Sequence, residues 1–157
     1  MKLVSWNCRG IRSPLRVKAI QDMLKMENTD LLLIQETKVD ENTVLNYGKE
    51  KWKKNAGMAI SARGASGGLA TLWVEKDFEI LNSFATQHWI FTELNHRVSK
   101  IWLSLFNIYV LVIYKEKKEC WGTIMDFLEA YNPTNIILAG DLNMILKANE
   151  KRRVLRE

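Results

Sequence analysis

One segment decides how the rest of the chain is interpreted: IILAGDLN, residues 136–143. Its apolar run begins just after Pro133 and ends in Gly-Asp, which predicts a strand buried on both faces that presents polar groups as it leaves the core. Because strand side chains alternate, residues two apart share a face, so we expect Asp141 and Asn143 to converge. The same pair also fits a strand end that merely closes a loop.

Length and composition indicate a single domain over residues 1–157, since 47% hydrophobic residues suffice for a core. Lys and Arg number 23 against 18 Asp and Glu, and the resulting charge of +5 favours a polyanionic partner. Cys8 and Cys120 have no metal-type spacing, which is typical of a reduced intracellular protein. No apolar run approaches the ~20 residues that cross a bilayer, so we expect no membrane partner.

The first part of the chain reads as a strand, a helix and a second strand. Residues 1–7 and 30–34 are the predicted strands, and Ser13-Pro14 is a start signal for a helix over residues 14–26. A strand-helix-strand unit of this kind implies a right-handed crossover between parallel neighbours. The polar residues Asn7 and Glu36, which follow the two strands, should therefore emerge at the same edge.

The middle of the chain predicts strands with few helices between them. Residues 38–55 are charged and fit a short helix and a loop, and their lysines fit a solvated face. Short connections favour antiparallel pairing among the strands that follow, and helical spacing returns at residues 119–130. The strands are predicted at residues 57–61, 69–74, 78–84, 89–94 and 101–114.

Four polar residues each follow an apolar strand: Asn7, Glu36, Asp141 and Asn143. Carboxylates and amides gathered at strand ends form an oxygen-rich site suited to Mg²⁺ or Mn²⁺, which keeps waters and takes only one or two protein carboxylates. Such an ion polarises a phosphoryl oxygen and stabilises charge that builds on the phosphate. The pattern therefore indicates phosphodiester hydrolysis.

Four short motifs occur in the order found in one superfamily: SWNCRG (5–10), QETK (35–38), SGGLATLW (66–73) and GDLN (140–143). The chain resembles the endonuclease/exonuclease/phosphatase superfamily, and in particular the apurinic-endonuclease-like domain of plant LINE-type (non-LTR) retrotransposons. The resemblance implies an α/β (α+β) fold of the DNase I-like type, a two-sheet sandwich flanked by helices. It also implies a monomeric, nuclear, Mg²⁺-dependent DNA endonuclease, fused in relatives to a reverse transcriptase.

The resemblance assigns roles to five residues. Glu36 matches the metal-binding glutamate, and Asn7 matches an asparagine that supports both metal and phosphate. Asp141 matches the aspartate that positions or activates the attacking water, and Asn143 the asparagine that holds the scissile phosphate by hydrogen bonds. Tyr114, at the end of the strand predicted over residues 101–114, stands where relatives place a phosphate-contacting tyrosine.

The chain also departs from the family pattern. The family's final Ser-Asp-His and a further metal-side aspartate have no match, and His88 and His96 read as ordinary strand-end or loop histidines. We therefore expect a C-terminally incomplete domain, impaired or inactive as a nuclease. Arg9 stands where some repair-enzyme relatives carry an acidic residue, which weakens the carry-over of abasic-site specificity.

Two other functions fit the sequence. The chain fits a non-catalytic nucleic-acid-binding relic that uses the basic stretches around Lys51 and Lys151 together with exposed tryptophans. It also fits a phosphatase of small phosphoesters from the same superfamily. The basic charge and the retrotransposon-like motifs favour the endonuclease over the phosphatase.

Overall fold

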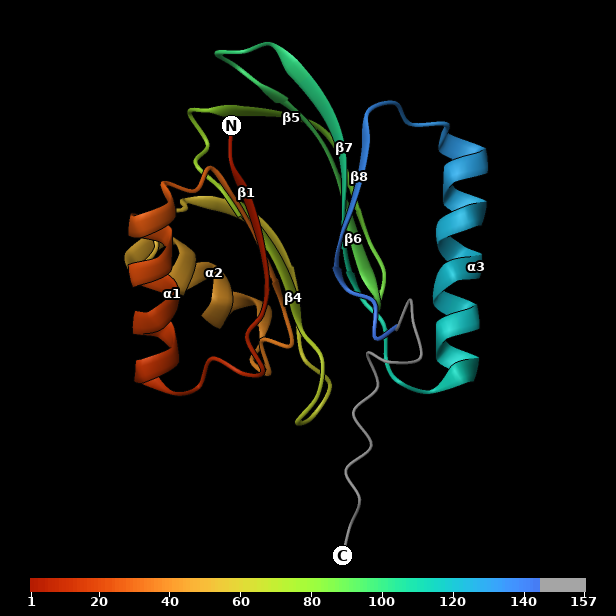
Figure 1. The fold of residues 1–157 in the computed structure, drawn as a ribbon, viewed down its shortest axis with the longest axis horizontal. Helices are drawn as coiled ribbons and strands as arrows, with labels where there is room; N and C mark the ends of the chain where they lie inside the picture. The colour runs from red at the N-terminus through yellow and green to blue at the C-terminus, as the bar shows by residue number, and fades with distance from the viewer. Residues whose placement is uncertain (145–157) are drawn as a thin grey trace, which may run out of the picture.

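The computed structural model describes residues 1–144 and arranges them in layers, with two sheets packed face to face between flanking helices (Figure 1). Sheet 1 has the order β1-β2-β4-β3, and sheet 2 has the order β5-β6-β7-β8. The strands are β1 Leu3–Asn7, β2 Leu31–Gln35, β3 Ala56–Ile60, β4 Leu69–Trp73, β5 Phe78–Ala85, β6 Trp89–His96, β7 Ile101–Tyr109 and β8 Ile136–Asp141. The helices are α1 Pro14–Glu27, α2 Glu41–Glu50 and α3 Tyr114–Tyr131.

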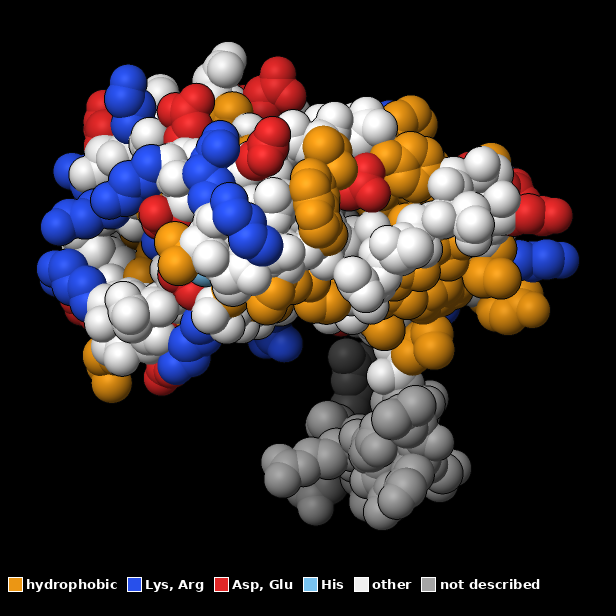
Figure 2. Space-filling view, turned by 90° about the horizontal axis from the view of Figure 1, so that it is seen from above, with side chains coloured by type: hydrophobic (Ala, Val, Ile, Leu, Met, Phe, Trp, Pro, Cys, Tyr) orange, Lys and Arg blue, Asp and Glu red, His pale blue; other side chains and the backbone are white. Residues whose placement is uncertain are grey.

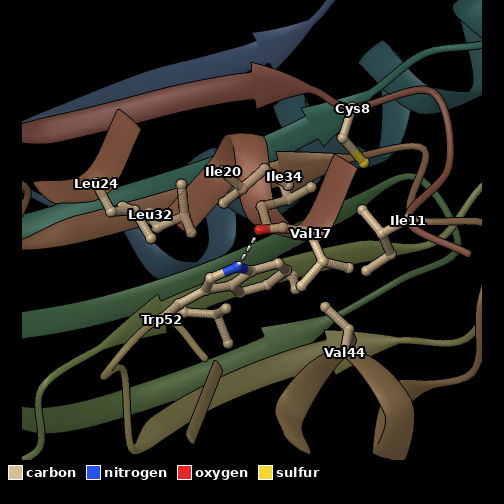
Figure 3. Packing of buried hydrophobic residues seen from close by; sticks show 11 residues of the cluster. Cys8, Ile11, Val17, Ile20, Leu24, Leu32, Ile34, Val44 and Trp52 are labelled. Carbon is tan, nitrogen blue, oxygen red and sulfur yellow. Dashed lines mark hydrogen bonds between the residues drawn. The ribbon is translucent and has the colours of Figure 1, made fainter. Parts of the chain in front are cut away.

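Helices α1 and α2 cover the outer face of sheet 1 (Figure 1). Val17, Ile20 and Leu24 of α1 are buried at helical spacing, in one cluster with Ile34 of β2 (Figure 3). Helix α1 begins at Pro14 and ends before Asn28, whose φ of 46° is left-handed. This helix forms the predicted crossover, because β1 and β2 pair in parallel with Asn7 opposite Gln35.

The two sheets enclose an apolar layer that includes Leu31 and Leu33 of β2 and Leu105 of β7. Helix α3 covers the other face of sheet 2 through an aromatic cluster in which Phe127 contacts Phe91 and Phe106. The expected antiparallel meander is confirmed for β5, β6 and β7. The two-sheet sandwich predicted from the sequence is likewise confirmed.

The boundary between β7 and α3 differs from the prediction. Strand β7 ends at Tyr109 rather than at residue 114, and α3 begins at Tyr114 rather than at residue 119. The apolar residues between them do not continue the sheet, since Val112 is 74% exposed. Hydropathy alone does not distinguish an exposed apolar connection from the end of a buried strand, which is why the prediction overran.

Strand β8 also differs from the prediction, because it lies at the edge of sheet 2 and is not buried on both faces. It pairs in parallel with β7, and Ile136 and Leu138 are 44% and 43% exposed. Figure 2 shows hydrophobic side chains gathered on the half of the surface formed by sheet 2 and α3, whereas Lys and Arg gather on the half that carries α1 and α2. Among the helices of residues 1–144, none is long and apolar enough to span a bilayer.

Candidate metal and phosphate site

The ends of β1, β2 and β8 bring together three of the predicted site residues. The Asn7 Nδ2 donates hydrogen bonds to Glu36 Oε1 at 2.9 Å and to Asp141 Oδ2 at 2.5 Å. All three residues are partly buried. The Asn7 amide at the end of β1 therefore contacts two carboxylates, that of Glu36 just after β2 and that of Asp141 at the end of β8. The meeting of Asn7 and Glu36 at one edge of sheet 1 was predicted from the sequence.

Local backbone geometry directs these side chains. Glu36 has a left-handed φ of 53°, and its carbonyl accepts a hydrogen bond from Gly10 N at 2.6 Å. The Asn7 Oδ1 accepts from Arg9 N at 3.1 Å. Because this bond fixes which end of the carboxamide faces the backbone, the amide group of Asn7 is turned toward the two carboxylates.

Asn143 lies beside Asp141 but not on the strand face that the alternation predicts. Strand β8 ends at Asp141, and Asn143 has a left-handed φ of 44°. The Asn143 backbone N–H donates to Asp141 Oδ1 at 3.0 Å, and its side-chain amide donates to Val110 O at 2.6 Å. A turn, rather than strand periodicity, thus places Asn143 next to the carboxylates.

The structure does not bring Tyr114 to this group. Tyr114 is the first residue of α3 and is 80% exposed. Tyr109 lies there instead, 8% exposed and opposite Asp141 in the β7–β8 register. Burial and the negative charges of Glu36 and Asp141 raise the pKa of Tyr109 to about 12, so its hydroxyl keeps its proton at neutral pH.

Tyr109 could have been found from the alternation along β7. Leu103 and Leu105 face the layer between the sheets, so Asn107 and Tyr109 share that side of the strand. His96 lies at the end of β6 and His88 in the turn between β5 and β6, as predicted. The backbone carbonyl of His88 accepts a hydrogen bond from Tyr109 N at 2.8 Å.

Positive side chains lie beside the carboxylates. Lys38 Nζ is 3.6 Å from Glu36 Oε2, and it lines a hollow of about 390 Å³ together with Arg9, Arg12 and Arg16. Backbone carbonyls orient two of the guanidinium groups, because Arg12 Nε donates to Lys38 O at 3.0 Å and Arg16 Nη1 donates to Cys8 O at 2.8 Å. The hollow is suited to an anionic group, and Lys38 connects it to Glu36.

The donor set at the site fits a hard divalent cation. Within residues 1–144, no group of three or more His, Cys, Asp or Glu side chains gathers as a metal site. Glu36 and Asp141 supply two carboxylates, however, and Mg²⁺ commonly uses one or two carboxylates while keeping several waters. These two residues would hold such an ion, with Asn7 between them.

Comparisons with known proteins show what the chain is similar to. A model of the Endonuclease/Exonuclease/phosphatase family matches residues 4–76. The exodeoxyribonuclease of Bacillus subtilis (strain 168) is 25% identical over 156 residues, which cover 92% of this chain and 59% of that protein. The chain is thus similar to this family over residues 4–76.

Solved structures share the fold. The mannosyl-6-phosphatase Bt3783 of Bacteroides thetaiotaomicron VPI-5482 has a TM-score of 0.71 at 14% identity, over 90% of this chain and 64% of that one. The D. rerio TDP2 complexed with a single-strand DNA product has a TM-score of 0.64 at 16% identity, over 91% of this chain and 60% of that one. The chain thus spans about three fifths of the length of these relatives, which are of nuclease and phosphatase type.

Proposed function

We propose that this chain carries the phosphodiester-cleaving site of a Mg²⁺- or Mn²⁺-dependent DNA endonuclease of the LINE retrotransposon type. The observation that supports the proposal is the junction at Asn7, whose amide contacts the carboxylates of Glu36 and Asp141. A carboxylate pair of this kind beside cationic side chains fits a divalent ion and a phosphate held side by side.

Each residue at the junction has a proposed part in the reaction. Glu36 and Asp141 hold the divalent ion, which when bound polarises the phosphoryl oxygen. Asp141 also orients the attacking water, while Asn7 and Asn143 hold the scissile phosphate by hydrogen bonds. Tyr109 takes the phosphate contact that the sequence had assigned to Tyr114, because its protonated hydroxyl lies at the site and can donate.

Charge supports a nucleic-acid substrate. The chain carries a net +5, and Arg9, Arg12 and Lys38 surround the hollow next to Glu36. Lys51 immediately follows α2, whereas Lys151 lies outside the described residues. The solved D. rerio neighbour with a DNA product is consistent with DNA as the partner. Fusion to a reverse transcriptase, a nuclear location and a monomeric state are further parts of this proposal.

A supercoiled-plasmid nicking assay tests the proposal. We expect weak Mg²⁺-dependent nicking by the wild-type chain, as for an impaired nuclease, that falls at least tenfold further in Glu36→Gln and in Asp141→Asn. Glu129→Gln and Asp126→Asn make the same chemical changes on exposed positions of α3 and should leave the rate unchanged. Equal nicking by all five proteins would exclude this site, and DNA binding without cleavage would favour a non-catalytic relic.

A phosphatase of small phosphoesters is the second candidate, favoured by the likeness of fold to the mannosyl-6-phosphatase. Release of inorganic phosphate from sugar phosphates separates the two functions. Release that depends on Glu36, with no nicking of plasmid DNA, would favour the phosphatase.

A further inference from the structure

A pair of buried amides crosses the interface between the two sheets directly behind the site. Gln35 Nε2 of β2 donates to Asn107 Oδ1 of β7 at 2.7 Å. Both residues are fully enclosed, with exposed fractions of 1% and 0%. Gln35 immediately precedes Glu36, and Asn107 lies two residues before Tyr109.

Each amide is also tied to other strands of sheet 1. Asn107 Nδ2 donates to Ala70 O of β4 at 2.9 Å and lies 3.3 Å from Thr71 Oγ1. Gln35 Nε2 also donates to Ser5 Oγ of β1 at 3.1 Å. A single asparagine of sheet 2 thus contacts β2 and β4 of the facing sheet directly, and β1 through Gln35.

The remainder of this interface is largely apolar, with leucines of both sheets, such as Leu33 and Leu105, in one buried cluster. Hydrophobic contacts are non-directional and hold two sheets together without specifying one alignment. Hydrogen bonds have a narrow range of distance and angle, and a buried amide that loses its partner is strongly penalised. The Gln35–Asn107 pair therefore selects one alignment of the two sheets.

That alignment sets the separation of the two halves of the site. In the parallel register of sheet 1, Asn7 lies opposite Gln35, so Gln35 fixes the strand ends that present Asn7 and Glu36. In sheet 2, Tyr109 follows Asn107 by two positions and lies opposite Asp141. A shift of Asn107 would therefore move the strand ends that carry Tyr109 and Asp141.

We infer that Gln35 and Asn107 are positioning residues that hold Glu36 of sheet 1 at metal-sharing distance from Asp141 of sheet 2. The consequence for catalysis rests on the proposed function, whereas the consequence for the geometry of the Asn7 junction does not. The two can therefore be measured separately.

Two variants remove the pair from opposite sides, Asn107→Leu and Gln35→Met, and both replace an amide by an apolar side chain of similar length. Asn95→Leu is the matched control, because Asn95 is a buried asparagine of β6 in the same sheet and takes no part in this network. The first readout is the side-chain amide signal of Asn7 in ¹H–¹⁵N NMR spectra, assigned by its loss in Asn7→Ser. The others are calorimetric Mg²⁺ affinity and nicking kinetics.

We expect both pair variants to remain folded and to shift the Asn7 amide signal. We also expect Mg²⁺ affinity and kcat to fall at least tenfold while KM for DNA changes less than threefold. Asn95→Leu should leave all of these within twofold of the wild type. An unchanged Asn7 signal and Mg²⁺ affinity in both folded variants would overturn the inference, as would unfolding of both, which would indicate a purely structural role.

The proposed function fails separately if the wild-type chain cleaves no phosphodiester. In that case the Asn7 amide signal still decides whether the Gln35–Asn107 pair aligns the junction.

Discussion

Gly140→Ala tests how tightly the end of β8 is held. Gly140 immediately precedes Asp141 and has a φ of +138°, which side chains rarely adopt. An added Cβ would lie 2.0 Å from Ile108 O and 2.7 Å from Ile108 N. Both atoms are backbone of the paired strand β7, so the two strands must separate to make room.

The cost follows from two effects. The unfavourable backbone conformation costs about 1–3 kcal/mol, and forcing a methyl group into packed structure costs about 1–3 kcal/mol more. We therefore expect urea unfolding to show a loss of about 2–6 kcal/mol in the free energy of unfolding. Because Asp141 moves with the separated strand, Mg²⁺ affinity should fall as well.

Gly122→Ala is the matched control. Gly122 lies inside α3, and an added Cβ there would have no neighbouring atom within 4 Å. Alanine is favoured over glycine in a helix, so this variant should gain up to about 1 kcal/mol. The steric reasoning predicts that Gly140→Ala lowers the free energy of unfolding by about 2 kcal/mol or more, so a decrease below about 1 kcal/mol would refute it.

Three further predictions concern tyrosines and thiols. Tyr109→Phe should lower the nicking rate at least tenfold, whereas Tyr114→Phe should leave it unchanged; the opposite result would restore the sequence-based assignment. Tyr109 loses its proton near pH 10 in the unfolded chain but only near pH 12 in the folded protein, so the free energy of unfolding should fall between these two pH values. Urea unfolding at pH 9 and at pH 11 should show this fall, and the fall should be smaller in Tyr109→Phe. Burial raises the pKa of Cys8 and of Cys120 to about 11, so about one thiol in a thousand is ionised at pH 8. The thiols of the native protein should therefore react slowly with Ellman's reagent, and those of the denatured protein should react quickly.

The carboxylate junction was largely predictable from the sequence. The apolar runs before Asn7, Glu36 and Asp141 locate the strand ends, and the parallel pairing expected of a strand-helix-strand unit places the first two at one edge. The junction of Asp141 with them depends on how the two sheets face each other, which no local pattern encodes. The resemblance of the GDLN motif to the superfamily supplied that step.

Other parts of the site could not be read from hydropathy. The run from Tyr109 to Ile113 is apolar throughout, so hydropathy does not show where the chain leaves the sheet or which of the two tyrosines is buried. The edge position of β8 depends on its neighbours rather than on its own residues. Buried amides such as Gln35 and Asn107 look like surface residues in a sequence, because only their partners make burial acceptable.

Calorimetric titration of the metal-free protein with MgCl₂ tests most directly whether distant carboxylates form one metal site. We predict a single Mg²⁺ site that weakens at least tenfold in Glu36→Gln and in Asp141→Asn, while Asp126→Asn binds as the wild type does. Because both carboxylates hold the same ion, the double variant should weaken less than the product of the two single effects. Wild-type affinity in either single variant, or two independent and multiplicative losses, would contradict a shared site.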